Sequence, residues 1–406
     1  MRKRVIAYNK IGCYTFCKQT TGGNFMYNIK LADYVIEPKP VSSNYLVACH
    51  YFPGWKPDKH RGFEAIWDYP ERTPLMGYYD ESNPEVTDWE IKWATEHGIN
   101  CFIYCWYRSN ENVGHPVTLE GIRLAHQIHE GLFNARYKDM IKFAIMWEAD
   151  NAGVVSDKED LLKNLMPFWI KEYFTKPNYL VIDNKPVLFV YDYSFHVLEA
   201  FGNSPEALKE ALGECNELIK QYGFDGMIFQ VEYRYGDLEV LNKHRASGYD
   251  QTFAYCWHTL QQFPTDKEAI AQQMHYMSLR AAFDPYFTIL TCSQAWDPHP
   301  WAKPENKDKV TRWKLSPESW RSLLERVKGL ADSLPADALG HKLIMLDNWN
   351  EWSEGHYISP HLSGGFQYLQ AVREVFTKRD NLPDYRLPDA IGLGPYDQDW
   401  KKPHQK

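Results

Sequence analysis

Short apolar runs that alternate with helical patterns constrain the fold of this chain more than any other feature. Each run has the length of a buried strand, and the segments between the runs read as helices. The eight runs are residues 45–52, 100–107, 142–148, 186–193, 224–231, 249–255, 286–292 and 341–349. Eight successive strand–helix pairs predict an α/β fold, specifically a single (β/α)8 TIM barrel.

The helix starts between these runs support the same fold. Residues 204–206 and 316–318 both read Ser-Pro-Glu, which places a capping serine before a proline at the first helical position. Further helices are expected at 84–97, from Thr265 onward and at 364–377. The main rival is a doubly wound open sheet, which would need a glycine-rich phosphate loop after the first strand. The sequence there, Tyr-Phe-Pro-Gly-Trp, is nothing like such a loop.

The predicted barrel occupies residues 41–378, between an N-terminal extension (1–40) and an irregular C-terminal tail (379–406). The chain starts with a basic stretch, but the following residues are too polar for a signal peptide, and no apolar run reaches transmembrane length. We therefore expect a soluble protein without a membrane span. Its compartment stays open, with the periplasm or the cell exterior as alternatives if the true start differs, for example at Met26.

Composition narrows the classes of partner. The 15 Trp and 27 Tyr often follow predicted strands, which suggests a surface that faces carbohydrate. The net charge of -8 and the lack of a basic stripe argue against nucleic acid. Most of the eight cysteines lie in or beside predicted strands and read as small buried residues, while Cys13 and Cys17 lack a matching second pair. Without a CxxC pair or an HExxH motif, we expect no metal site.

Polar and aromatic side chains follow every predicted strand, at the end where barrel enzymes build their active sites. Two of these residues keep an alternative interpretation, because Asp192 also suits a cap of the next segment and Trp147 also suits the barrel core. The ten residues that we expect in a substrate cleft are Tyr51, Trp106, Tyr107, Trp147, Glu148, Tyr191, Asp192, Glu232, Tyr255 and Asn350.

The end of the last strand carries the strongest chemical signal. Residues 347–355 follow an apolar run and present Glu351, Glu354, two indoles and two amides, although unpaired buried carboxylates are costly. If the turn is nearly helical, the two glutamates, three residues apart, share one face. Two close carboxylates raise one pKa, which suits a general acid at neutral pH. Sequence spacing leaves open whether their separation suits a retaining or an inverting glycosidase.

Residues 349–355, with 365–372 after them, resemble the C-terminal signature of the WbsX-like proteins. These proteins are related to glycoside hydrolase family 99, the endo-α-mannosidase and endo-mannanase family. The blocks at 71–80, 88–94 and 104–108 resemble the same group. The likeness therefore spans about residues 45–377, and it implies a (β/α)8 fold.

The resemblance also implies a retaining endo-hydrolase without a metal or organic cofactor. Glu351 would act as a base on the sugar's own 2-hydroxyl and Glu354 as the acid/base, through a 1,2-anhydro sugar. The chain departs from the mannosidases at Ser353, where they carry His, and at His356, where they carry Thr. It has Ser359 where the WbsX-like proteins usually have Glu. Mannose specificity is therefore not implied.

Taken together, the residues and the resemblance predict an endo-acting glycoside hydrolase that cleaves a polysaccharide or glycan. Two alternatives stay open: a glycosyltransferase of polysaccharide biosynthesis and a non-catalytic carbohydrate-binding protein. The sequence shows no nucleotide-sugar feature, which argues against the first, and it keeps both Glu351 and Glu354, which argues against the second. The sugar, the linkage and the oligomeric state stay open as well.

Overall fold

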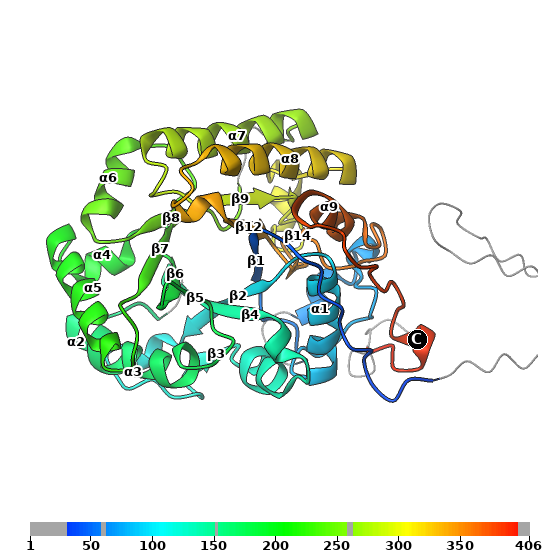
Figure 1. Cartoon of the computed structure of the whole chain (residues 1–406), viewed down its shortest axis with the longest axis horizontal. Coiled ribbons are helices and arrows are strands. Elements are labelled where there is room, and N and C mark those ends of the chain that lie inside the picture. Colours follow the sequence, from blue (N-terminus) through cyan, green and yellow to red (C-terminus); the bar gives the residue numbers. More distant parts are fainter. Residues whose placement is uncertain (1–30, 58–61, 151–152, 258–262, 397–406) are drawn as a thin grey trace, which may run out of the picture.

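The computed structural model describes residues 31–57, 62–150, 153–257 and 263–396. The expectations about Cys13, Cys17, Met26 and the basic start lie outside these residues. Parallel strands surround a central axis and helices cover them on the outside (Figure 1). The predicted (β/α)8 barrel is thereby confirmed.

The barrel consists of eight parallel strands whose order is β8-β7-β6-β4-β2-β1-β12-β9. They are β1 (Leu46–Tyr51), β2 (Cys101–Arg108), β4 (Lys142–Glu148), β6 (Lys185–Tyr191), β7 (Ile228–Glu232), β8 (Gln251–Phe253), β9 (Leu290–Ser293) and β12 (Leu343–Asp347). The first and last strands pair directly, with Cys49 opposite Leu346. Between β8 and β9 a single parallel bridge, Thr252 to Thr288, nearly closes the barrel.

Helices follow the strands as the capping signals predict. Asn83, Ser204 and Ser316 each cap a helix through a side-chain oxygen, and Thr265 forms a capping box with Glu268. The α-helices are α1 (Pro84–Glu96), α2 (Lys158–Asp160), α3 (Met166–Trp169), α4 (His196–Ala200), α5 (Pro205–Lys220), α6 (Leu238–Ala246), α7 (Asp266–Phe283), α8 (Pro317–Ser333) and α9 (Gln367–Phe376).

The regular pattern breaks after β2 and β4. The connection after β2 contains only short turns, among them a π segment (Gln127–Gly131), and the helical layer after β4 mixes α2 and α3 with two further π segments (Leu161–Leu165 and Ile170–Phe174). The 3-10 turns are Gly62–Ile66, Pro70–Arg72, Asn110–Asn112, Leu132–Asn134, Lys138–Met140, Pro304–Lys309, Leu339–His341 and Asp389–Ile391.

Some predicted strands start too early, because side chains divert the backbone. The predicted strand 224–231 begins only at Ile228, since the Met227 amide donates to Asn216 Oδ1. The run 286–292 begins only at Leu290, since the Tyr286 amide donates to Asp284 Oδ1 in a turn. Both side chains offer the backbone a local alternative to the strand ladder.

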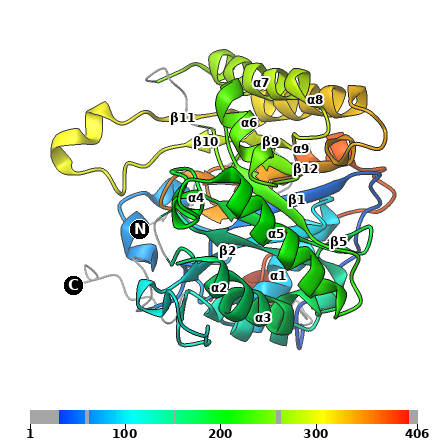
Figure 2. The same ribbon diagram turned by 90° about the vertical axis from the view of Figure 1, so that its left-hand side faces the viewer.

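Six two-residue strands decorate the barrel: β3 (Ile122–Arg123), β5 (Val181–Ile182), β10 (Ala295–Trp296), β11 (Trp313–Lys314), β13 (Asn350–Glu351) and β14 (His356–Tyr357). The segment that joins β10 and β11 extends beyond the barrel (yellow in Figure 2). Because β10 follows the carboxyl end of β9, this segment belongs to the end of the barrel where strands terminate.

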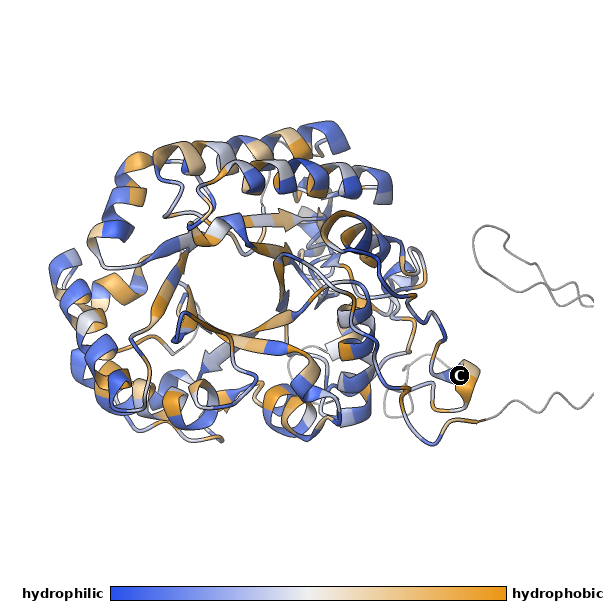
Figure 3. Ribbon diagram, viewed as in Figure 1, coloured by the Kyte–Doolittle hydropathy of each residue, from blue (hydrophilic) through white to orange (hydrophobic). Residues whose placement is uncertain are grey.

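The core lies between the strands and the helical layer. The strands are predominantly apolar, whereas the helices mix apolar and polar residues (Figure 3). Buried indoles fill the interface, among them Trp93 of α1, Trp169 of α3 and Trp320 of α8. All six cysteines in the described part of the chain are buried, as expected for small core residues. None of the described helices combines the length and apolar character that crossing a membrane requires.

Candidate active site

A cavity of about 380 Å³ opens at the carboxyl ends of the barrel strands. Glu351 and Glu354 both line it, together with four of the ten residues predicted for the cleft: Tyr107, Glu148, Tyr191 and Tyr255. The remaining lining residues are Phe52, Cys105, Arg123, Met146, Cys256, Trp296 and Trp301. The structure thus brings the predicted carboxylates together with aromatic side chains.

Trp106 and Trp147, which were expected in the cleft, do not line this cavity. Side chains alternate along a strand, so Cys105 and Tyr107 face the cavity while Trp106 points the other way. Its indole donates to Tyr173 Oη at 3.1 Å and packs on Trp169. Trp147 likewise contacts Trp169, with 5.3 Å between ring centroids. Both tryptophans therefore point outward from their strands and pack against the helical layer.

Four other predicted residues also lie off the cavity. Asn350 accepts a hydrogen bond from the Phe52 amide at 2.9 Å, and Tyr51 donates to Glu90 Oε2 at 2.8 Å. Glu232 forms a buried ion pair with Arg234 at 2.7 Å. Asp192 follows β6 and accepts a hydrogen bond from the Val197 amide. These four side chains lie outside the lining of this cavity and contact other protein groups, and their part in substrate binding stays a prediction.

The two glutamates lie on a tight hairpin, not on a helical turn. β13 and β14 pair antiparallel, with Glu351 opposite His356, and the turn between them carries Glu354. Gly355 has a φ of +77°, and a Cβ at this position would approach Asp297 Cβ to 2.7 Å. Only glycine fits this turn without strain. The hairpin brings both carboxylates to one cavity, although the geometry differs from the helical expectation.

The environments of the two carboxylates differ. Glu351 is buried and accepts from Ser353 Oγ at 2.8 Å, whereas the side chain of Glu354 is 29% exposed. Burial, and next the negative charge of Glu354, raise the pKa of Glu351 well above its usual range. Glu351 therefore keeps its proton to a higher pH than an ordinary glutamate does.

A chain of hydrogen bonds runs from Glu354 into the barrel core. His356 Nε2 donates to Glu354 Oε2 at 2.9 Å, its Nδ1 bonds Asp347 Oδ1, and Ser293 Oγ donates to Asp347 Oδ2 at 2.6 Å. Burial disfavours a charged imidazole, but the charges and hydrogen bonds of Asp347 and Glu354 outweigh it and raise the pKa of His356 to about 10. His356 is therefore a cation at neutral pH and faces Glu354.

Arg72 contacts the β13–β14 hairpin from outside the last βα unit. Its guanidinium donates to the carbonyl oxygen of Trp352 at 2.9 Å and pairs with Asp297 Oδ2 at 2.7 Å. The Asp297 amide in turn donates to the Glu354 carbonyl at 2.7 Å. Arg72 belongs to the 71–80 block that carries the family resemblance, so this block supports the turn that holds Glu354.

Glu90 of α1 performs a similar role at the other side of the hairpin. It is fully buried, accepts from the Trp349 indole at 3.0 Å and from the Tyr51 hydroxyl, and lies near Glu81. Burial is the main cause that raises the pKa of Glu90 from 4.5 to about 8. At neutral pH the folded protein therefore holds a proton here.

Glu90→Gln should remove a pH dependence of stability. Between about pH 4.5 and 8 the folded protein retains a proton that the unfolded chain releases, so stability falls as pH rises through this window. The free energy of unfolding of Glu90→Gln should therefore gain on that of wild type from pH 5.5 to 8.5, by at most a few kcal/mol. Glu217→Gln on the surface of α5 is the control. A wild-type-to-variant difference that stays constant with pH would contradict the raised pKa.

Sequence reasoning missed several residues of the site. Arg123 and Trp301 come from segments between the strands, where no strand-end signal points to them. Trp296 follows the predicted seventh strand, 286–292, but is absent from the ten residues expected in the cleft. His356 was noted only as a departure from the mannosidases, although its spacing of two from Glu354 in a hairpin could have indicated contact.

The family model described as "Glycosyltransferase WbsX" matches residues 68–372, well over half of the chain. Two relatives from strains of Xanthomonas campestris pv. campestris, both named "Uncharacterized protein WxcX", are 22% identical over 332 and 331 residues. The match covers 76% of this chain but 43% of each relative. The chain thus spans less than half the length of these curated relatives.

Solved structures show the same fold. The GH99 endo-alpha-mannosidase from Bacteroides thetaiotaomicron superposes with a TM-score of 0.56 at 15% identity, over 81% of this chain and 95% of that chain. A glycoside hydrolase-like protein superposes with a TM-score of 0.54 at 17% identity, over 86% and 98% of the two chains. The fold is therefore that of the GH99 barrels, and by the family match the chain belongs to the WbsX glycosyltransferase family.

Proposed function

We propose that this protein is an endo-acting glycoside hydrolase that cleaves a polysaccharide or glycan with retention of configuration. Family membership and the GH99-like barrel support a carbohydrate-active enzyme. The observation that carries the finer proposal is the cavity itself, in which Glu351 and Glu354 lie among Tyr107, Tyr191 and Tyr255. Two carboxylates in different environments are what acid–base cleavage of a glycosidic bond needs.

In the proposed reaction the sugar supplies its own nucleophile. Glu351 takes the proton of the 2-hydroxyl, O2 bonds to C1, and the C1–O bond to the leaving group breaks while Glu354 protonates the departing oxygen. Water then attacks C1, Glu354 takes a proton from it, and the C1–O2 bond opens as Glu351 returns its proton to O2. Two inversions at C1 give net retention.

The proposed first step needs Glu351 ionised, whereas burial and the negative charge of Glu354 raise its pKa. A sugar hydroxyl that donates to Glu351 favours the ionised form of that carboxyl. Substrate binding therefore sets the reactive proton distribution in this proposal.

The family is described as a glycosyltransferase family, which raises a second candidate, a glycosyltransferase that uses the same barrel. Such an enzyme would need to bind an activated sugar donor and would transfer the glycosyl group to an acceptor hydroxyl instead of water. Glu351 and Glu354 could serve that reaction as well, so the two carboxylates do not distinguish the candidates. The sugar donor and the acceptor of the glycosyl group do.

Release of reducing ends tests the proposal. Wild type should release them from at least one member of a panel of α-mannans, bacterial exopolysaccharides and plant polysaccharides, and Glu351→Gln and Glu354→Gln should release them far more slowly. NMR of the first product should show the anomeric configuration of the substrate. No release from any polymer, together with saturable binding of a nucleotide sugar, would replace the hydrolase by the transferase.

A further inference from the structure

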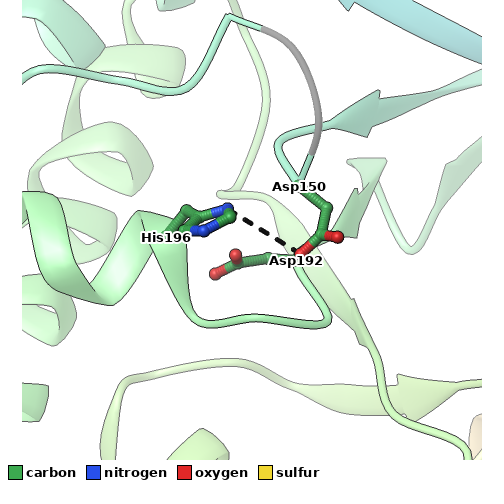
Figure 4. Close-up of side chains that lie close together, drawn as sticks. All are labelled: Asp150, Asp192 and His196. Atoms are coloured by element: carbon green, nitrogen blue, oxygen red, sulfur yellow. Dashed lines mark ion pairs between the residues drawn. The ribbon is translucent and has the colours of Figure 1, made fainter.

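Three potential metal ligands meet at the catalytic end of the barrel, beside the cavity but not in it. Asp150 follows β4, Asp192 follows β6, and His196 is the first residue of α4. One ligand atom from each lies within 4.8 Å of the other two. Ligand atoms around a tetrahedral Zn²⁺ lie about 3.3–3.6 Å apart, as its bond lengths of about 2.0–2.2 Å require, so small side-chain rotations would bring the three atoms to bonding positions. The three side chains converge as Figure 4 shows.

The backbone explains why these residues converge. β4 and β6 are parallel neighbours, and the Ala149 amide donates to the Tyr191 carbonyl at 2.8 Å, so Asp150 and Asp192 leave the sheet side by side. Asp150 Oδ1 then accepts from the Ser194 amide at 2.7 Å. Phe195 adopts a left-handed conformation, with φ of +64°, and the next residue, His196, turns back to 3.8 Å from Asp150 Oδ1.

Asp192 provides an independent observation. Its side chain is buried, with 2% exposed, and Oδ2 accepts from the Val197 amide at 3.1 Å. Within the described residues, the other oxygen, Oδ1, has no hydrogen-bond partner. A buried carboxylate oxygen without a partner is costly. A capping role explains Oδ2, but it explains neither Oδ1 nor the approach of His196.

We propose that Asp150, Asp192 and His196 form a binding site for a divalent transition-metal ion, Zn²⁺ or Mn²⁺. Two carboxylates and one imidazole suit these ions, whereas Ca²⁺ and Mg²⁺ favour oxygen ligands alone. Asp150 and His196 also border a second cavity of about 440 Å³, to which the remaining coordination positions open. Glu199, one turn along α4, lines the same cavity, so its carboxylate is a candidate for a further ligand.

The site would stabilise one wall of the substrate cavity. Glu148 and Tyr191, which line that cavity, directly precede the segments that carry Asp150 and Asp192. An ion that joins the two segments fixes the ends of β4 and β6 relative to each other. This inference does not depend on the proposed hydrolase reaction, and its test does not use activity.

Metal binding to the full chain, freed of any histidine tag and treated with a chelator, tests the site. Wild type should bind one equivalent of Zn²⁺ or Mn²⁺ by calorimetry and elemental analysis, and its melting temperature should rise on addition of the metal. Asp192→Asn and His196→Ala should each weaken binding by at least about tenfold, since even outer-shell changes cost 10–100-fold. Asp225→Asn and His275→Ala remove an exposed carboxylate and an exposed imidazole elsewhere, and should leave binding unchanged.

Pulsed EPR of wild type with Mn²⁺ gives a measurement that does not depend on the folding of a variant. It should detect the nitrogen of a single coordinated imidazole. Absence of saturable binding of both ions would overturn the proposal, as would equal affinity in a folded Asp192→Asn, binding of Ca²⁺ or Mg²⁺ alone, or a Mn²⁺ signal without nitrogen coupling.

Discussion

Glu354→Gln should lower turnover on a cleavable polysaccharide by about 10²–10⁴-fold, the range that general acid–base catalysis contributes. Glutamine keeps the shape and an oxygen that can accept from His356, but it cannot give a proton to the leaving group. The side chain of Glu354 is 29% exposed, so stability should change by less than about 1 kcal/mol. Rates of reducing-end release and a denaturation curve, measured on the same preparation, check both statements.

A substrate with a good leaving group assigns the two roles. A nitrophenolate leaves without a proton, so Glu354→Gln should release it in a burst at nearly the wild-type rate, whereas Glu351→Gln should stay inactive because the 2-hydroxyl still needs a base. Glu148→Gln removes another carboxylate from the same cavity and serves as the matched control. The opposite pattern would exchange the roles of the two glutamates, and full activity of a folded Glu354→Gln on the polysaccharide would end the assignment.

His356→Leu should destabilise the protein by about 3–5 kcal/mol, the usual effect of removing one partner of a buried ion pair. Asp347 is fully buried. Without the imidazole its charge would keep only the hydrogen bond from Ser293 and no access to water. His97→Leu is the control, because His97 is also buried but burial lowers its pKa to about 4, so it is neutral. Chemical denaturation at pH 7 should show a clearly smaller loss for His97→Leu.

Two further measurements identify the charge as the cause. The pKa of His356 rises from 6.5 to about 10 on folding, so its stabilisation is fully present below about pH 6.5 and is lost as pH rises through 10. The gap between wild type and His356→Leu should narrow accordingly. Adding Asp347→Leu to His356→Leu should recover part of the loss, because no unpaired charge remains. Additive losses would show that the two residues act independently.

Most of the barrel could be predicted from the sequence because its signals are local. Each buried strand is a short apolar run, and each of α5, α7 and α8 begins at a recognisable cap. Strand starts were less predictable. Asn216 of α5 accepts from the Met227 amide 11 residues later, a contact that depends on how the helix packs, whereas Asp284 captures the Tyr286 amide in a local turn that overrides the apolar pattern.

The sequence predicts which strand ends contribute to the site, but not which of two adjacent side chains at such an end faces the cavity. Adjacent side chains on a strand point to opposite sides, so a strand end rich in aromatics does not reveal which of them faces the cavity. Tyr107 faces it and Trp106 does not, and Glu148 faces it while Trp147 does not. The proximity of Glu351 and Glu354 was predicted, and it holds in the cavity, although a hairpin brings it about. Their catalytic roles stay a prediction.

Pairing of the first strand with the last has a consequence for biosynthesis. One edge of β1 meets β2, but the other meets β12, which lies roughly 300 residues later in the chain. At typical translation rates that interval takes about 15–60 s, during which the backbone N–H and C=O groups on that edge of β1 have no partner strand. Arg72 and Glu90 likewise gain the hairpin that they contact only after β12 has been made. In a newly made chain that edge of β1 therefore needs transient cover until β12 has left the ribosome.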